Sequence, residues 1–282
     1  TRGIVRGYEH DQNILVSMSR YLKLVVSLTF FFFNLCLADP LIVAHRGSSF
    51  EAPENTLPAF RLAWEQGADA IEGDFLLTKD GQIVCIHDAS TKRLADKNLV
   101  VSKSTFEELR ALDVGAWKHT KFKGTKIPTI SEVFATIPKG KKIFVEVKCG
   151  PEIVPFLVKE IRKANLETDQ VRLICFNTKV IKSFKEYMPN HKAYWLSGFN
   201  KKNGSWKPSV DQVITTLQNC KADGLDSQHT IPPEFSKSVI KAGFEWHAWT
   251  INDAQTAQRL AKRGIDSITT DRPKLIGLGF RR

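Results

Sequence analysis

Short runs of β-branched and aromatic residues alternate along the chain with longer segments of mixed polarity. The apolar runs predict nine strands, at 41–45, 70–77, 83–87, 142–148, 171–176, 192–197, 222–227, 244–251 and 266–270. Helix-length segments lie between most of them, at 56–66, 151–165, 178–187, 209–220, 233–242 and 253–263. This alternation indicates a parallel sheet covered by helices. No linker rich in Pro, Gly or Ser interrupts it, so we expect 39–282 to form a single domain.

The third apolar run does not fit the alternation. Only the five residues TKDGQ separate it from the second run, and Asp-Gly is favoured in two-residue hairpin turns. With Asp80 and Gly81 as the loop, Asp74 would lie opposite His87. The third run is then an antiparallel return, which leaves eight parallel strands. We therefore predict an α/β fold, a (β/α)8 TIM barrel with a small insertion, at about 89–140, after a β-hairpin that follows strand 2.

The N-terminal segment differs from the rest. The first methionine is Met18, so residues 1–17 are interpreted as upstream sequence that lies outside the fold. Residues 18–38 have a short basic start, an apolar stretch at 24–33 and small residues before Asp39. The apolar stretch is shorter than the roughly 20 residues that span a bilayer. We expect a cleaved signal peptide at 18–38 and export to the periplasm or the extracellular space, with an uncleaved anchor as the alternative.

Composition limits the class of protein but not its partner. The chain has 282 residues, 42% of them hydrophobic and 25% charged, which is typical of a globular protein and excludes a disordered or polytopic membrane protein. The formal charge is +11, and since residues 1–38 carry four basic and two acidic side chains, the remainder keeps +9. Such an excess favours anionic partners. No periodic basic and aromatic pattern indicates nucleic-acid binding.

Acidic side chains interrupt two strands that should be apolar on both faces. Glu72 and Asp74 alternate with apolar residues in one strand, and Glu146 and Lys148 alternate with valines in another. Alternation places each pair on one face, which we interpret as the barrel interior near its carboxyl end, where barrel active sites lie. Converging carboxylates repel one another unless a cation neutralises them, and oxygen ligands suit one divalent ion, Ca²⁺ or Mg²⁺. The alternative is a set of buried ion pairs with Lys148 and Arg46.

Two histidines and two cations accompany the acids. His45 ends the first strand, and His87 ends the third apolar run. A lone strand-end histidine is more often a hydrogen-bonded core residue, but two beside a carboxylate cluster indicate a general acid and a general base. Arg46 offers a planar fork for phosphate oxygens, and Lys148 adds a point charge. Together these groups favour displacement at phosphorus.

These motifs resemble the glycerophosphodiester phosphodiesterase family. The resemblance covers most of 41–273, through HRGSSFEAPENT (45–56), EGD (72–74), TKDG (78–81), HD (87–88), IPTISEVF (127–134), EVK (146–148), WTIN (249–252) and ITTDRP (268–273). It implies a barrel enzyme that hydrolyses small glycerophosphodiesters to sn-glycerol 3-phosphate and an alcohol through a cyclic phosphate. It also implies metal ligation by Glu72, Asp74 and Glu146, acid–base catalysis by His45 and His87, and phosphate binding by Arg46 and Lys148.

Several alternatives remain at the level of sequence. Trp249 could wall the pocket for the leaving alcohol, or it could be plain packing. A lysophospholipase D-type enzyme would use the same metal and histidines on lysophospholipids. We expect contact with a membrane only in this alternative. A barrel glycosidase would use Glu72 and Glu146 as its acid pair. A binding protein without turnover is the fourth hypothesis, and the oligomeric state is left open.

Overall fold

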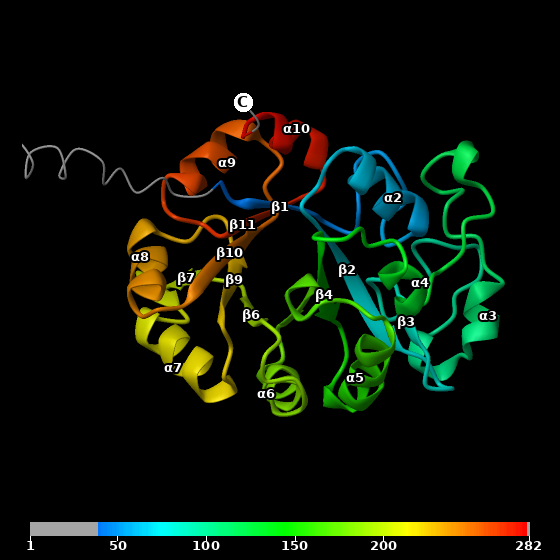
Figure 1. Cartoon of the computed structure of the whole chain (residues 1–282), viewed down its shortest axis with the longest axis horizontal. Helices are drawn as coiled ribbons and strands as arrows, with labels where there is room; N and C mark the ends of the chain where they lie inside the picture. Colours follow the sequence, from blue (N-terminus) through cyan, green and yellow to red (C-terminus); the bar gives the residue numbers. More distant parts are fainter. Residues whose placement is uncertain (1–38, 281–282) are drawn as a thin grey trace, which may run out of the picture. The chain divides into compact units, whose positions relative to one another are not determined.

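In the computed structural model, which describes residues 39–280, eight parallel strands close into a barrel with helices around it (Figure 1). The barrel strands are β1 (Leu41–Ala44), β2 (Ala70–Leu77), β4 (Lys142–Val147), β5 (Val171–Cys175), β6 (Ala193–Ser197), β9 (Gly224–Gln228), β10 (Glu245–Trp249) and β11 (Ser267–Thr270). The barrel is closed because β1 pairs in parallel with both β2 and β11. The predicted TIM barrel is confirmed.

Helices cover the outside of the barrel. They are α2 (Leu57–Glu65), α5 (Val154–Lys163), α6 (Thr178–Tyr187), α7 (Val210–Cys220), α8 (Pro233–Lys241), α9 (Ala254–Ala261) and α10 (Pro273–Leu278). The segment between the hairpin and β4 adds two short helices, α3 (Phe106–Arg110) and α4 (Ile130–Phe134). The described residues also form four 3-10 turns, at Val101–Lys103, Thr120–Phe122, Pro151–Ile153 and Thr168–Gln170.

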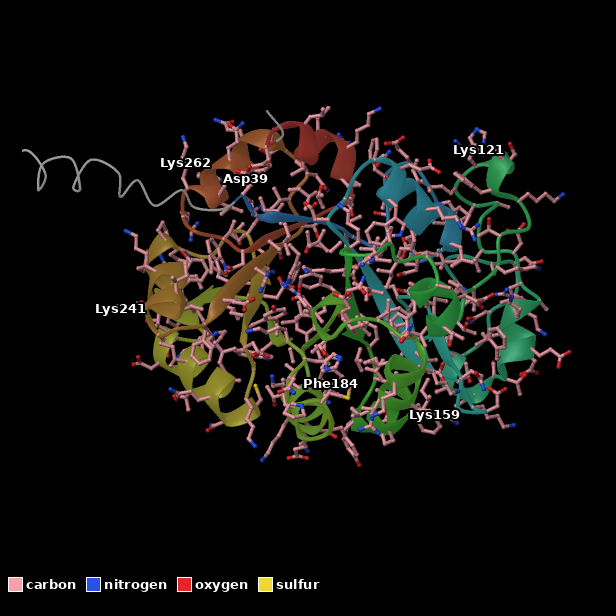
Figure 2. The ribbon with its side chains drawn as sticks, viewed as in Figure 1. Asp39, Lys121, Lys159, Phe184, Lys241 and Lys262 are labelled. Carbon is pink, nitrogen blue, oxygen red and sulfur yellow. The ribbon has the colours of Figure 1, made fainter. Side chains whose placement is uncertain are left out.

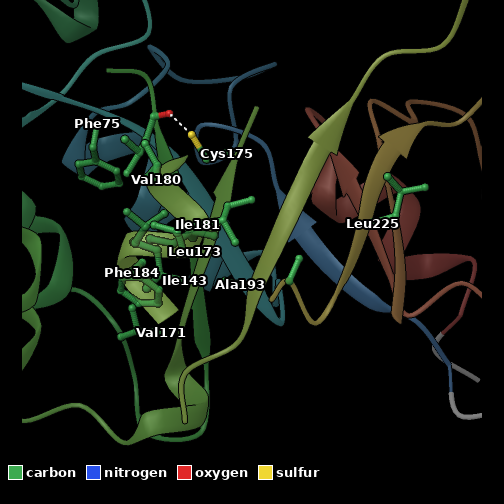
Figure 3. Close-up of a cluster of buried hydrophobic side chains, with 14 of the residues drawn as sticks. Phe75, Ile143, Val171, Leu173, Cys175, Val180, Ile181, Phe184, Ala193 and Leu225 are labelled. Atoms are coloured by element: carbon green, nitrogen blue, oxygen red, sulfur yellow. Dashed lines mark hydrogen bonds between the residues drawn. The ribbon is translucent and has the colours of Figure 1, made fainter. Parts of the chain in front are cut away.

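The main hydrophobic core lies between the strands and the helices (Figure 3). Phe184 of α6 is fully buried, and burying such a side chain contributes about 1.5–3 kcal/mol. Cys175 of β5 donates a hydrogen bond from its thiol to the carbonyl of Val147 on β4, at 3.1 Å. Lysines such as Lys159 and Lys241 lie outside this layer, on the periphery of the molecule (Figure 2). The apolar faces of the helices therefore hold the barrel strands in place from outside.

The hairpin after β2 forms with a different register from the predicted one. In the hairpin of β2 with β3 (Ile83–Cys85), Phe75 lies opposite Cys85, so the predicted pairing of Asp74 with His87 is wrong. The amide of Thr78 donates to the carbonyl of Gln82, which leaves a three-residue loop. Its last residue, Gly81, has a φ of +78°, as expected for a three-residue hairpin loop with a left-handed third position. His87 therefore lies beyond the strand.

A second hairpin was not predicted. Strands β7 (Asn200–Lys202) and β8 (Ser205–Lys207) pair between β6 and α7. Their residues are almost all exposed, so they show no apolar alternation. The Asn203-Gly204 turn, with φ values of +50° and +78°, is the available sequence signal.

The predicted upstream sequence and signal peptide lie outside the described residues. Within 39–280, no helix combines the length and the hydropathy needed to cross a membrane.

Candidate active site

Three buried carboxylates meet at the carboxyl ends of neighbouring strands. Asp74 of β2 lies beside Glu146 of β4 in the parallel register, and Glu72 precedes Asp74 by two residues on the same face. One oxygen from each of the three lies within 4.8 Å of the others. Glu72 and Asp74 are 1% exposed and Glu146 is 8% exposed. The structure thus brings together the three acids that the alternation predicted.

Burial and mutual repulsion set the charge of this cluster. Burial, Asp74 and Glu146 raise the pKa of Glu72 well above its usual value. Burial and the charge of Asp74, partly offset by Lys148, raise the pKa of Glu146 to about 7. Burial acts in the same direction on Asp74, but the charges of Arg46, Lys148 and His87 outweigh it and lower the pKa of that carboxyl. Burial and mutual repulsion therefore disfavour ionisation of all three acids at once unless a cation binds them.

The cations beside the acids do not satisfy all their oxygens. The ammonium of Lys148 lies 2.7 Å from Glu146 and 3.5 Å from Asp74, and the guanidinium of Arg46 lies 3.1 Å from Asp74. These are the ion pairs of the alternative interpretation. However, among the described residues 39–280, Glu72 Oε1 and Asp74 Oδ1 are buried without a hydrogen-bond partner. Such unpartnered carboxylate oxygens fit a hard divalent cation such as Ca²⁺ or Mg²⁺, so ion pairs and a metal site are compatible here.

The turn after β1 places Arg46 against the acids. Arg46 has a left-handed φ of +56°, and its backbone amide donates to Glu72 Oε2 at 2.8 Å. The next residue is Gly47, with φ +80°, where a Cβ would lie 2.6 Å from the backbone of Ala59. Only glycine fits this position. The packing of α2 against the turn therefore fixes where the Arg46 amide and guanidinium point.

Both predicted histidines line the same cavity, and each contacts a carboxylate. His45 Nδ1 lies 2.7 Å from Asp271 Oδ1, and His87 Nδ1 lies 2.7 Å from Asp88 Oδ1. Because an ionised carboxylate only accepts, each Nδ1 carries the proton. The other ring nitrogen, Nε2, is then the atom that can take up or release a proton in the cavity. His45 Nε2 lies 4.0 Å from Glu72 Oε2, next to the acid cluster.

Three positioning residues were not identified from the sequence. Asp271 follows β11, and Thr270 pairs with Ala44, so a closed barrel brings Asp271 beside His45. Burial acts to raise the pKa of Asp271, but hydrogen bonding to His45 and its other partners outweighs it and lowers the pKa to about 2. Asp88 directly follows His87. Asn55 holds Asp74 from two sides, donating its side-chain amide to Oδ2 at 2.7 Å and accepting from the Asp74 backbone amide at 3.0 Å.

The site opens into a cavity of about 210 Å³ at the carboxyl end of the barrel. All the predicted site residues except Asp74 line it. The lining residues are His45, Arg46, Glu72, His87, Glu146, Lys148, Ile174, Phe176, Leu196, Asp226, Trp249, Thr250 and Thr269. Most of the charged and titratable groups come from β1, β2, β3 and β4 and the segments that follow them, while β5, β6 and β10 supply mostly apolar side chains. Asp226 of β9 was not identified from the sequence.

Comparison with known proteins agrees with this arrangement. Residues 45–275 match the glycerophosphoryl diester phosphodiesterase family. The chain belongs to this family. Among curated relatives, the glycerophosphodiester phosphodiesterase of Caldanaerobacter subterraneus subsp. tengcongensis is 35% identical over 84% of this chain and 96% of its own. The family resemblance predicted from the motifs is confirmed.

Solved structures of the family share the barrel. A phosphodiesterase from Oleispira antarctica, solved with the product sn-glycerol 3-phosphate, is 27% identical and superposes with a TM-score of 0.76 over 85% of this chain and 96% of its own. The glycerophosphodiester phosphodiesterase of Thermotoga maritima is 25% identical, with a TM-score of 0.69 over 85% of this chain and 97% of its own.

Proposed function

We propose that this protein is a metal-dependent phosphodiesterase that hydrolyses glycerophosphodiesters to sn-glycerol 3-phosphate and an alcohol. The observation that carries the proposal is the meeting of Glu72, Asp74 and Glu146 within 4.8 Å, in a cavity that both histidines line. A bound divalent ion would supply stabilisation of the charge on a phosphate oxygen. The family membership favours this reaction over the glycosidase and the non-catalytic binding protein.

The side chains of this chain divide the remaining work. Arg46 and Lys148 hold the non-bridging phosphate oxygens by charge-assisted hydrogen bonds. One histidine takes the proton from the glycerol hydroxyl that attacks phosphorus, and the other protonates the oxygen of the leaving alcohol. The resulting cyclic phosphate is opened by water, with the two histidines exchanging roles. The Nδ1 contacts with Asp271 and Asp88 keep each ring oriented for these transfers.

The test is the release of sn-glycerol 3-phosphate from glycerophosphocholine, with and without EDTA. We expect chelation to abolish release and either Ca²⁺ or Mg²⁺ to restore it, and the comparison of the two ions identifies the better cofactor. Full activity of metal-stripped protein would contradict the metal assignment. Absence of release with every ion would contradict the proposed function.

Lysophospholipids are a second candidate substrate class, and an exposed aromatic side chain at the cavity entrance favours them. Phe176 lines the cavity and is 50% exposed, and its ring meets that of Trp249 edge to face with centroids 6.0 Å apart. An exposed aromatic side chain at an entrance can contact an acyl chain or a lipid surface. Faster turnover of lysophosphatidylcholine than of glycerophosphocholine, reduced selectively by Phe176→Ser, would favour this candidate. Glycerophosphocholine turning over faster would favour the first.

We also propose that the protein is exported through a cleaved signal peptide at 18–38. The apolar stretch at 24–33 and the small residues before Asp39 support this. Expression from Met18 in a secreting host should give a mature protein that begins at Asp39, as measured by intact mass and N-terminal sequencing. A cell-associated product that retains residues 18–38 would support the uncleaved anchor instead.

A further inference from the structure

Asp226 is a buried acid that takes no part in the proposed mechanism. It lies on β9, which is separated from β2 around the barrel by three strands on either side, and it is 1% exposed. Its Oδ1 atom is buried without a hydrogen-bond partner, and no ion pair joins it to a cation of the described chain, residues 39–280. It also lines the cavity. A buried polar atom with no partner destabilises the fold unless something binds it.

The surroundings of Asp226 indicate a neutral partner. Its neighbours on the cavity wall include the apolar side chains of Ile174 and Leu196. Burial and the charge of Glu146 raise the pKa of Asp226 well above its usual value, which favours the protonated carboxyl over the carboxylate. A carboxylic acid offers one O–H donor and an acceptor oxygen. It suits a ligand group that both donates and accepts, rather than a cation.

A second unpartnered atom lies on the neighbouring strand. Trp249 Nε1 is buried and has no hydrogen-bond partner in the part of the chain that the structure describes, and Trp249 lines the same cavity. Strands β9 and β10 pair in parallel, with Asp226 beside His247 and Trp249 beside Gln228. The indole N–H can only donate. A donor and a carboxyl group on adjacent strands together complement a hydroxyl, which accepts from the first and donates to the second.

We propose that Asp226 and Trp249 form a subsite for the glycerol hydroxyl that takes no part in the reaction. This inference rests on the proposed function. The glycerol unit with its free hydroxyls is common to small glycerophosphodiesters, whereas the leaving alcohol varies in size and needs the open side of the cavity, where Phe176 is half-exposed. A lysophospholipid carries its acyl chain on the non-reacting hydroxyl, so the subsite favours the first substrate class. The deeply buried position of Asp226 therefore suits the glycerol. A substrate that lacks this hydroxyl leaves both polar atoms unpaired, and it is discriminated against for that reason.

The test compares two substrates that share the attacking hydroxyl. One is glycerophosphocholine, and the other is its analogue with propane-1,2-diol in place of glycerol, which lacks only the non-reacting hydroxyl. We expect wild-type kcat/KM to be about 10- to 100-fold higher for glycerophosphocholine. Asp226→Leu should cleave the two substrates at similar, low rates. Asp226→Asn, whose amide also donates and accepts, should keep part of the preference.

The controls separate a binding role from a structural one. Because leucine replaces an unpaired buried polar group, Asp226→Leu should melt at or above the wild-type temperature. Asp211→Leu, the same change at an exposed position of α7, should keep the wild-type preference. Equal wild-type rates on the two substrates, or a full preference in Asp226→Leu, would overturn the subsite and leave the proposed function standing. A wild-type protein that cleaves neither substrate would overturn both.

Discussion

His45 and His87 are arranged in the same way although they come from unrelated segments. Each has Nδ1 2.7 Å from a carboxylate, from Asp271 for one ring and Asp88 for the other. A carboxylate at this nitrogen fixes the tautomer and stabilises the ring when it is protonated. The two imidazoles can therefore alternate between acid and base during one turnover, as a cyclic intermediate requires.

Removing either imidazole should greatly lower the rate of the reaction and leave the fold intact. We expect His45→Ala and His87→Ala each to lower kcat by about 10²- to 10⁴-fold, because each ring transfers a proton at a different oxygen. Release of sn-glycerol 3-phosphate and circular dichroism are the measurements. His119→Ala, which removes an exposed imidazole from the segment before β4, is the matched control. A near-normal rate in either active-site variant would remove that histidine from the mechanism.

Asp271 should matter through the histidine that it contacts. Asp271→Asn keeps the size of the side chain, but its amide can accept or donate, so Nδ1 of His45 no longer has a fixed protonation state. We expect kcat to fall at least tenfold with little change in KM, and the pH profile of kcat to shift. A variant with unchanged kcat and pH profile would show that the 2.7 Å contact with His45 does not serve the reaction.

For helices and strands, the sequence predicts the features that depend on the periodicity of side chains. It does not predict the features that depend on loop length or on closure of the barrel. The alternation around Glu72, Asp74 and Glu146 placed the acids on the inner face, because strand side chains have a period of two. The hairpin register was wrong because DG fits a two-residue loop as well as the observed three-residue one. Asp271 was missed because its partnership with His45 exists only when β11 closes on β1.

The amino end of β10 carries a network that makes stability depend on pH. Glu245 Oε2 accepts from the Tyr194 hydroxyl at 2.7 Å, and its other oxygen lies 2.9 Å from the ammonium of Lys192. Burial acts to raise the pKa of Glu245, but its contacts with His247, Tyr194 and Lys192 outweigh burial, so the pKa is lowered. A carboxylate with a lowered pKa stabilises the fold above its unfolded pKa of about 4.3, and this stabilisation is lost as the pH falls through the folded value.

Glu245→Gln should therefore destabilise the fold only at pH values at which the Glu245 carboxylate is ionised. We expect the free energy of unfolding in urea to fall by about 1–3 kcal/mol at pH 7, and the difference from wild type to shrink below about pH 4. Glu186→Gln, at an exposed position of α6, should show neither effect. A difference that stays constant from neutral to acid pH would mean that the charge of Glu245 contributes nothing.

In the molecule as a whole, closure of the barrel brings charged side chains together around the cavity. Residues far apart in sequence, from His45 to Trp249, line one cavity of about 210 Å³, and the carboxylates among them repel one another. The helices pack outside the strands and hold these side chains close together. Folding stability and metal binding should therefore be linked, since a cation that binds only the folded barrel stabilises it by mass action.

This linkage gives a measurable shift in melting temperature. At an ion concentration about a hundredfold above Kd, binding adds about 2.7 kcal/mol, which corresponds to a rise of roughly 5–10 °C for a domain of this size. Glu72→Gln should lose most of the rise. In EDTA the same variant should melt at or above the wild-type temperature, because it removes an acid whose ionisation is disfavoured by burial and by the charges of Asp74 and Glu146. Glu186→Gln should behave like wild type, and an undiminished ion-dependent rise in Glu72→Gln would place the cation elsewhere.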